Sequence, residues 1–450
     1  MFNTFQISRR TFLRRCSLGA AATGLPLWFI ERDLAEAAES AGLTAAGPDA
    51  RPGIALIGCG GKGAGDLQEA ARFGNVVALC DVDENHLNAF ARQYGRNGPA
   101  PAIYSDFRKL LERADVHVVI NATPDHWHSL INIAAAKAKK DVYGEKPLTL
   151  DLAEGRQVIK AVRDNQVVFQ TGTQQRSDRR FRLACELVRN GRIGRLQQVN
   201  VWVPAGLRAG PFPRASVPRG LNWDFWLGQA PRVRYLPQRC HEQFRWWWDY
   251  AGGPVTDWGA HHNDIVRWGI GLDGPTDVEA KVLVGPIPGG YTTCAQFEAT
   301  LMWPNGVRHV VKTTTADNYS GIAIDRRGQR NGIRFEGADG WIWVNRASIA
   351  ASNEDIINTQ LPDDAIHLPV SNNHMANFFD CVRSRKDPIA TVEDGHLAAA
   401  IGHLIIVSLR QGRKFHWDPQ KEEFVGDGAK IGNAHLGRKM RKPYDYSFVG

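Results

Sequence analysis

GIALIGCGGKGAGDLQEAARFG, residues 53–74, is the stretch that decides the fold. An apolar run ends at a cluster of glycines, and Leu67, Ala70 and Ala71 then follow with the spacing of one helix face. A run of this kind before glycines predicts a buried strand and a tight turn, and the spacing after it predicts a helix.

The same alternation of apolar run and helical segment continues beyond residue 74. Helical spacing in 84–95 and 127–139 separates these runs, which predicts a doubly wound parallel sheet. From about residue 196 the strands follow one another with short turns, which predicts a second, mostly antiparallel sheet. The runs in the first part are NVVALCDVD (75–83), VHVVINATP (116–124) and DVYGEKPLTL (141–150); those in the second are LQQVNVWV (196–203), TDVEAKVLV (276–284), CAQFEATLMW (294–303), VRHVVKTTT (307–315) and IRFEGADGWIWV (333–344).

The N-terminus differs in character from the rest of the chain. Ser8–Leu13 reads SRRTFL, an apolar run from Leu18 to Ile30 follows, and Ala35–Ala37 suits a signal peptidase. This order predicts a twin-arginine signal, use of the twin-arginine export machinery and a periplasmic location. The run is shorter than the ~20 residues of a spanning helix, so no stable membrane span is expected. An uncleaved amphipathic leader is the alternative.

Composition narrows the class of protein. The 450 residues are 43% hydrophobic and 23% charged, enough for two ordinary cores. The net charge of +8 is scattered without a basic and aromatic stripe, so no nucleic-acid partner is expected. The seven cysteines form no CxxC pair, which indicates free thiols and no structural zinc.

The glycine cluster contains a dinucleotide-binding motif. Gly58, Gly60 and Gly63 form G-x-G-x-x-G at the junction of strand and helix, with Gly61 inside it. Such glycines allow the tight turn, the approach of a pyrophosphate and close helix packing. Asp81 ends the next strand, where an acid can bind ribose hydroxyls and repel a 2′-phosphate, so NAD is favoured over NADP. The alternative is a glycine-rich turn in an ordinary α/β fold.

Two further segments carry candidate catalytic groups. Lys146 lies at the end of a buried strand, where doubly wound folds bind ligands. The alternative is an ordinary surface lysine. Asp257 and His261 stand four residues apart, so on a helix the carboxylate can support the imidazole as a base. The alternative is a helix cap and a core histidine.

The second segment contains two other residue pairs with possible roles. We expect Asp264 to pair with Arg267. A metal site at His262 and Asp264 lacks a third ligand at useful spacing, so no metal is expected.

These motifs resemble one family, the Gfo/Idh/MocA oxidoreductases. The resemblance rests on G-x-G-G-x-G, T-P-D-H-x-H at 123–128, E-K-P at 145–147, D-x-x-x-H at 257–261 and the tail NFFDCVRSRKDPIATVEDG, and it spans nearly the whole mature chain. It implies hydride transfer at a sugar or cyclitol hydroxyl, with Lys146, Asp257 and His261 around the reacting carbon. It also implies that Thr123, Pro124, His128, Glu145 and Lys146 line the cofactor, and that an open-faced second sheet forms a homo-oligomer.

The expected organisation has five parts. They are a signal peptide at 1–40, a linker at 41–52, an NAD-binding Rossmann domain at 53–172, a substrate and oligomerisation α+β domain at 173–370, and C-terminal helices and a tail at 371–450 that pack back on the Rossmann domain.

An aromatic insert precedes the second catalytic segment. It contains Trp223, Trp226, Trp246–Trp248 and Tyr250, and aromatic faces bind sugar rings. We expect most of them to pack the domain junction and expect Arg245, Trp248 and His262 to contact substrate.

Export would make free cofactor scarce, so a retained NAD is expected. Two schemes regenerate it: exchange between two substrates, or redox-neutral glycoside cleavage by oxidation, elimination, hydration and reduction. A non-catalytic sugar-binding protein is the third alternative.

Overall fold

The first domain is a six-stranded parallel sheet. The computed structural model describes residues 24–40, 51–96 and 99–450, apart from 316, 320, 322, 326, 327 and 329. The strands lie in the order β3-β2-β1-β4-β5-β6, which confirms the predicted doubly wound sheet. They are β1 (Gly53–Ile57), β2 (Asn75–Cys80), β3 (Ala102–Tyr104), β4 (Val118–Asn121), β5 (Asp141–Gly144) and β6 (Phe169–Thr171).

Helices cover both faces of this sheet because its strands are apolar on both sides. Ile54 and Leu56 of β1 pack with α3 (Gly61–Ala70) and α4 (Glu84–Tyr94). Ala55 and Ile57 of the same strand pack on the other face with α5 (Phe107–Leu111), α6 (Asp125–Lys137) and α7 (Leu152–Asn165). The chain order reverses between β1 and β4, which opens a crevice at the carboxyl ends of these strands.

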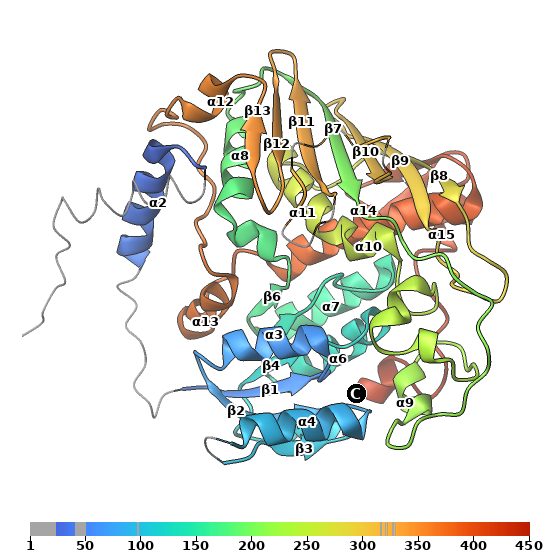
Figure 1. Ribbon diagram of the computed structural model, residues 1–450. Coiled ribbons are helices and arrows are strands. Elements are labelled where there is room, and N and C mark those ends of the chain that lie inside the picture. The colour runs from blue at the N-terminus through green and yellow to red at the C-terminus, as the bar shows by residue number, and fades with distance from the viewer. Residues whose placement is uncertain are drawn as a thin grey trace, which may run out of the picture.

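The second sheet has nine strands in the order β13-β12-β11-β7-β10-β9-β8-β14-β15. Only β7 and β10 pair in parallel, so the predicted mostly antiparallel sheet is confirmed. Helices α8 (Arg179–Arg189), α11 (Gly259–Ile270) and α14 (Val392–Gln411) lie between it and the first domain (Figure 1). The strands are β7 (Leu196–Val203), β8 (Asp277–Val284), β9 (Gln296–Met302), β10 (Arg308–Thr313), β11 (Gly332–Gly337), β12 (Trp341–Val344), β13 (Ile349–Ala351), β14 (Phe415–Asp418) and β15 (Glu423–Val425).

Short helices complete the described part of the chain. The insert between β7 and β8 contributes four of them, and in Figure 1 its helix α9 lies beside the C-terminus, next to the first domain. They are α2 (Leu27–Ser40), η2 (Gln174–Ser177), α9 (Trp223–Leu227), η3 (Pro237–Arg239), η4 (His241–Trp246), α10 (Pro254–Asp257), α12 (Glu354–Asn358), α13 (His374–Ser384), α15 (Ala429–Asn433) and η5 (Tyr446–Val449).

The C-terminal segment is divided between the two domains. Helix α13 packs Met375 and Phe378 on the first sheet, and Val449 of η5 packs on its other face. Strands β14 and β15 instead extend the second sheet through β8, because the apolar side chains of Phe415 and Phe424 join its core. Residues 371–450 therefore contribute to both domains, and the predicted boundary at residue 371 does not divide one domain from the other.

Helix α14 alone among the described helices is long and apolar enough to cross a membrane. In the folded protein 83% of its apolar window is buried. It is a core helix between the two domains.

Helix α2 corrects the predicted N-terminal boundary. We expected residues 1–40 to lie outside the fold, yet Phe29 and Ile30 are buried in the second domain's core. Asp33 is completely buried and forms ion pairs with Arg179 and Arg182 of α8. This helix therefore packs as part of the folded body. The twin-arginine motif itself lies outside the described residues.

Candidate active site

A cleft of about 1330 Å³ opens at the carboxyl ends of β1, β2, β4 and β5. Both domains contribute to it, because the insert and α11 of the second domain face the loops that follow these strands. Its lining includes Gly58, Gly60, Gly61, Asp81, Thr123, Pro124, His128, Glu145, Lys146, Arg245, Asp257 and His261. Twelve of the predicted site residues thus meet in one place.

The glycine turn leaves space for a ligand where the sequence predicts the cofactor. Gly58 has a φ of +96°, and a Cβ on Gly63 would lie 2.2 Å from the Gly58 carbonyl oxygen, so both positions need glycine. A Cβ on Gly60 or Gly61 would meet no protein atom within 4 Å. These two glycines leave room beside the N-terminus of α3, where backbone N–H groups bind phosphate. The turn therefore fits a pyrophosphate.

Replacement of Gly60 by alanine tests this fit. The added methyl group should lower the affinity for NAD roughly tenfold or more, while the denaturation midpoint stays near that of wild type, because no protein atom is displaced. Equilibrium titration with NAD and chemical denaturation measure the two quantities. Gly285→Ala is the control outside the cleft, where an added Cβ meets its nearest atom at 3.8 Å. Unchanged NAD affinity in Gly60→Ala would contradict the assignment.

Asp81 lies directly beside the glycine turn. One carboxylate oxygen accepts the Cys59 N–H at 2.7 Å and the other accepts the Asp83 N–H at 2.8 Å. Burial raises the pKa of Asp81, although these two hydrogen bonds oppose it. The carboxylate is therefore held where the adenosine ribose of a dinucleotide would lie.

The T-P-D-H-x-H segment forms the wall after β4. Thr123 donates its hydroxyl to Asn121 at 2.7 Å, and Pro124 is the N-cap of α6. The ring nitrogens of His128 lie 2.7 and 2.8 Å from the carbonyl oxygens of Pro147 and Thr123. His128 thus joins two loops of the cleft, and both of its nitrogens are occupied by the backbone.

Sequence reasoning missed the partner of Glu145. Lys62, in the first turn of α3, lies 3.1 Å from Glu145 and 2.5 Å from Asp66. Burial would raise the pKa of Glu145, but the charges of Lys62 and Lys146 outweigh it and lower that pKa. Glu145 also accepts a hydrogen bond from the Gln174 side-chain amide at 3.0 Å. Through these contacts Glu145 stabilises the glycine turn. A lysine between the motif glycines was the available signal.

Asp257 supports Lys146, and not His261 as the sequence predicted. Its carboxylate accepts Lys146 Nζ at 2.9 Å and lies 3.5 Å from Arg245 Nε. Burial would raise the pKa of Asp257, but these two cations hold it below its ordinary value. Asp257 is the last residue of α10, and Lys146 reaches it from the segment that follows β5. Asp257 therefore orients the lysine.

His261 lies on the same cleft without a carboxylate partner. Its Nδ1 is buried and forms no hydrogen bond. Burial, and then the nearby charges of Arg346 and Lys146, place the pKa of His261 well below its ordinary value. The imidazole is therefore neutral at pH 7, which is the form that accepts a proton.

Three other expectations are corrected. His262 is completely buried against Trp258 and does not line the cleft; burial lowers its pKa to about 3. Trp248 packs against the second domain's core, and Trp246 lines the cleft instead. Asp264 pairs through both oxygens with Arg176 at 2.7 and 2.8 Å, and not with Arg267, because η2 brings Arg176 across the face of α11.

Most of the insert's aromatic side chains pack against one another, and not mainly at the domain junction as the sequence predicted. Trp226, Trp247 and Tyr250 are buried in a cluster of their own, and Trp223 stacks on Trp226 with ring centroids 4.8 Å apart. Trp226 also reaches the cleft. The insert is thus a small core that walls the cleft.

Asp125, in the first turn of α6, is a cleft residue that sequence reasoning missed. Burial raises its pKa to about 6, against the charges of Lys146 and Arg245. Its signal was the acid within T-P-D-H-x-H. A carboxyl that titrates near neutrality beside Lys146 can hold or release a proton.

Asp125→Asn should change how stability depends on pH. The folded state binds the Asp125 proton up to about pH 6 and the unfolded state only up to about 3.8, so wild-type stability falls as pH rises through this window. The amide removes this loss of up to about 3 kcal/mol. Denaturation at about pH 8 should favour the variant, and at about pH 3 the difference should vanish. An equal difference at both pH values would contradict the shifted pKa.

Together, the sheet order, the glycine turn and the cleft define a two-domain oxidoreductase that uses a nicotinamide dinucleotide. Residues 53–173 match the oxidoreductase family's NAD-binding Rossmann fold, and residues 201–446 match its C-terminal alpha/beta domain. The chain belongs to the Gfo/Idh/MocA oxidoreductase family, and its cofactor is NAD.

Relatives with established names share part of the chain. Myo-inositol 2-dehydrogenase of Thermotoga maritima is 33% identical over 187 residues, which are 41% of this chain and 54% of that protein. Levoglucosan dehydrogenase of Pseudarthrobacter phenanthrenivorans is 30% identical over 189 residues, 40% of this chain and 48% of that protein. The chain thus spans about half the length of these relatives.

A solved structure shares the whole architecture. The WlbA dehydrogenase of Bordetella pertussis, in complex with NADH and UDP-GlcNAcA, matches with a TM-score of 0.61 and 19% identity. The match covers 82% of this chain and 98% of that one, and it supports the fold.

Proposed function

We propose that this protein oxidises a sugar or cyclitol hydroxyl by hydride transfer and keeps its NAD bound between turnovers. The observation that carries the proposal is the convergence of Lys146 and His261 on one cleft with the glycine turn. Both aligned relatives are named dehydrogenases of a cyclitol or a sugar, which supports the substrate class.

The chemistry follows from the positions of these side chains. NAD, held at the glycine turn and Asp81, would supply the acceptor for a hydride from the substrate carbon. Lys146, oriented by Asp257, donates a hydrogen bond to the reacting hydroxyl and stabilises negative charge on its oxygen. The neutral imidazole of His261 takes the hydroxyl proton. Arg245, beside Asp257, and the face of Trp246 bind the remaining hydroxyls and C–H groups.

One experiment tests substrate and chemistry together. The purified full-length protein is mixed with monosaccharides, cyclitols and disaccharides, and the absorbance of reduced nicotinamide is followed. A substrate should reduce the cofactor within one turnover, and denaturation of untreated protein should release NAD(H). Failure of every hydroxyl compound to reduce NAD would overturn the proposal. Cleavage of a disaccharide without net reduction would indicate redox-neutral glycoside hydrolysis instead.

We also propose that the protein is exported in folded form. The twin-arginine motif and the need to load NAD before export support this. Cell fractionation should find the wild-type protein in the periplasm, and a variant with Arg9 and Arg10 both replaced by lysine in the cytoplasm. Equal distribution of the two proteins would contradict export by this route.

A further inference from the structure

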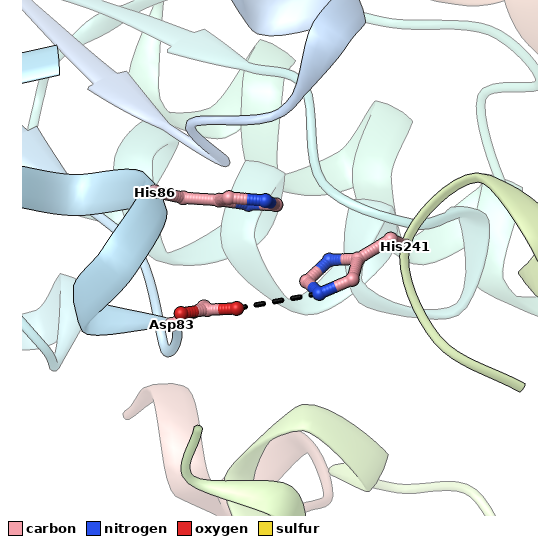
Figure 2. A group of neighbouring side chains, drawn as sticks. All are labelled: Asp83, His86 and His241. Carbon is pink, nitrogen blue, oxygen red and sulfur yellow. Dashed lines mark ion pairs between the residues drawn. The ribbon is translucent and has the colours of Figure 1, made fainter. Parts of the chain in front are cut away.

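A cluster of two histidines and one aspartate lies at the rim of the cleft. Asp83, His86 and His241 each offer one ligand atom, and these three atoms lie within 4.8 Å of one another. Figure 2 shows the two imidazoles facing each other, with the Asp83 carboxylate beside the His241 ring. Their ring centroids are 4.4 Å apart. Aspartate and histidine are a ligand set that Zn²⁺ and similar ions prefer.

Backbone hydrogen bonds join the first domain to the insert beside this cluster. Glu84 N–H donates to the Gly220 carbonyl and Asn222 N–H to the Val82 carbonyl, both at 2.9 Å. Asp83 itself pairs with Leu221 in a β-bridge. These contacts therefore fix the backbone around Asp83 before any ion binds, and His241 comes from the start of η4 in the insert. Such preorganisation lowers the cost of assembling a site.

One of the ligand–ligand distances matches the geometry of a metal site. His241 Nε2 lies 3.3 Å from Asp83 Oδ2, which is long for an N–H···O hydrogen bond. Ligands at about 2.0–2.1 Å in a tetrahedron lie about 3.3 Å apart, so this pair already has the spacing of one tetrahedral edge. The other Asp83 oxygen accepts the Asn85 N–H at 2.9 Å, which orients the carboxylate.

His241 has an unusual backbone conformation. Its φ is +50°, in the left-handed region that costs a residue other than glycine free energy. The side chain of this same residue reaches from the insert to Asp83 in the first domain. Strain held at one residue is a recurrent feature of ligand-binding positions.

We propose that Asp83, His86 and His241 bind one divalent transition-metal ion of the Zn²⁺ class and thereby clamp the insert to the first domain. Three protein ligands leave a fourth position for water. The clamp lies next to Asp81, whose carboxylate accepts the Asp83 N–H. With the proposed function, an ion bound at this position slows the release of the dinucleotide from the cleft, and this consequence rests on that function. The metal site itself does not depend on it.

The test uses full-length protein without a histidine tag, dialysed against Zn²⁺ and then against buffer. Metal content is measured by mass spectrometry, and binding by calorimetry. We expect one zinc per chain in the wild type and at least a tenfold loss of affinity in His86→Gln and in His241→Asn, since asparagine tolerates the left-handed conformation. His416→Gln is the matched control, because His416 and Asp277 form an exposed pair 2.8 Å apart on the second sheet.

Each outcome decides the proposal. Zinc retained by wild type and His416→Gln but lost from the two cluster variants supports it. If the wild type retains no zinc, or if His241→Asn retains as much zinc as the wild type, the cluster is an ordinary ion pair and the metal proposal is overturned. NAD release is measured separately in folded protein with and without zinc. The zinc-binding result therefore stands even if the dehydrogenase function is disproved.

Discussion

Replacement of Lys146 by methionine should lower kcat by about a hundredfold to ten-thousandfold, with little change in NAD affinity. Methionine keeps much of the side-chain volume but cannot donate to a substrate oxygen or to Asp257. Lys146 Nζ is placed by two contacts with Asp257, to its carboxylate and to its carbonyl oxygen at 3.1 Å, so the loss falls on the reacting hydroxyl and not on the glycine turn.

The measurement is single-turnover reduction of bound NAD by a substrate found in the absorbance screen. Lys160→Met is the control, because Lys160 lies exposed on α7. A rise in KM with kcat unchanged would mean that Lys146 only binds substrate, which contradicts its part in the chemical step.

Replacement of Asp33 by alanine should lower the free energy of unfolding by about 3 kcal/mol. Arg182 is 2% exposed, and loss of one partner from a buried ion pair leaves its charge poorly compensated. The guanidinium also covers the Phe29 ring at 4.4 Å, so the pair and the apolar packing of α2 depend on each other. Glu186, 3.1 Å from Arg182, keeps the loss from being larger.

Chemical denaturation of the full-length protein measures this effect. Glu31→Ala is the control, because it removes a carboxylate from the same helix at a half-buried position. Equal stability of Asp33→Ala and wild type would show that the Asp33–Arg182 pair does not hold α2 on the folded body.

The predictions that held rest on local constraints. The glycines at 58 and 63 are needed wherever a strand turns this sharply into a helix, so they can be read from the sequence. The carboxyl ends of parallel strands share one edge, so Asp81 and Lys146 had to lie near that turn. The predictions that failed concern partners. Spacing of four residues suggested that Asp257 supports His261, but Lys146 and Arg245 lie beside its carboxylate instead.

The sequence alone determined the order of strands and helices, the two kinds of sheet and the cofactor turn, because each depends on periodicity and on residues with special backbone freedom. Only the tertiary structure decided that Asp257 meets Lys146 across 111 residues, that Trp246 and not Trp248 faces the cleft, and that α2 docks through Asp33. The physical reason is that side-chain partners are set by how two domains pack, and a carboxylate pairs with whichever cation that packing brings near it.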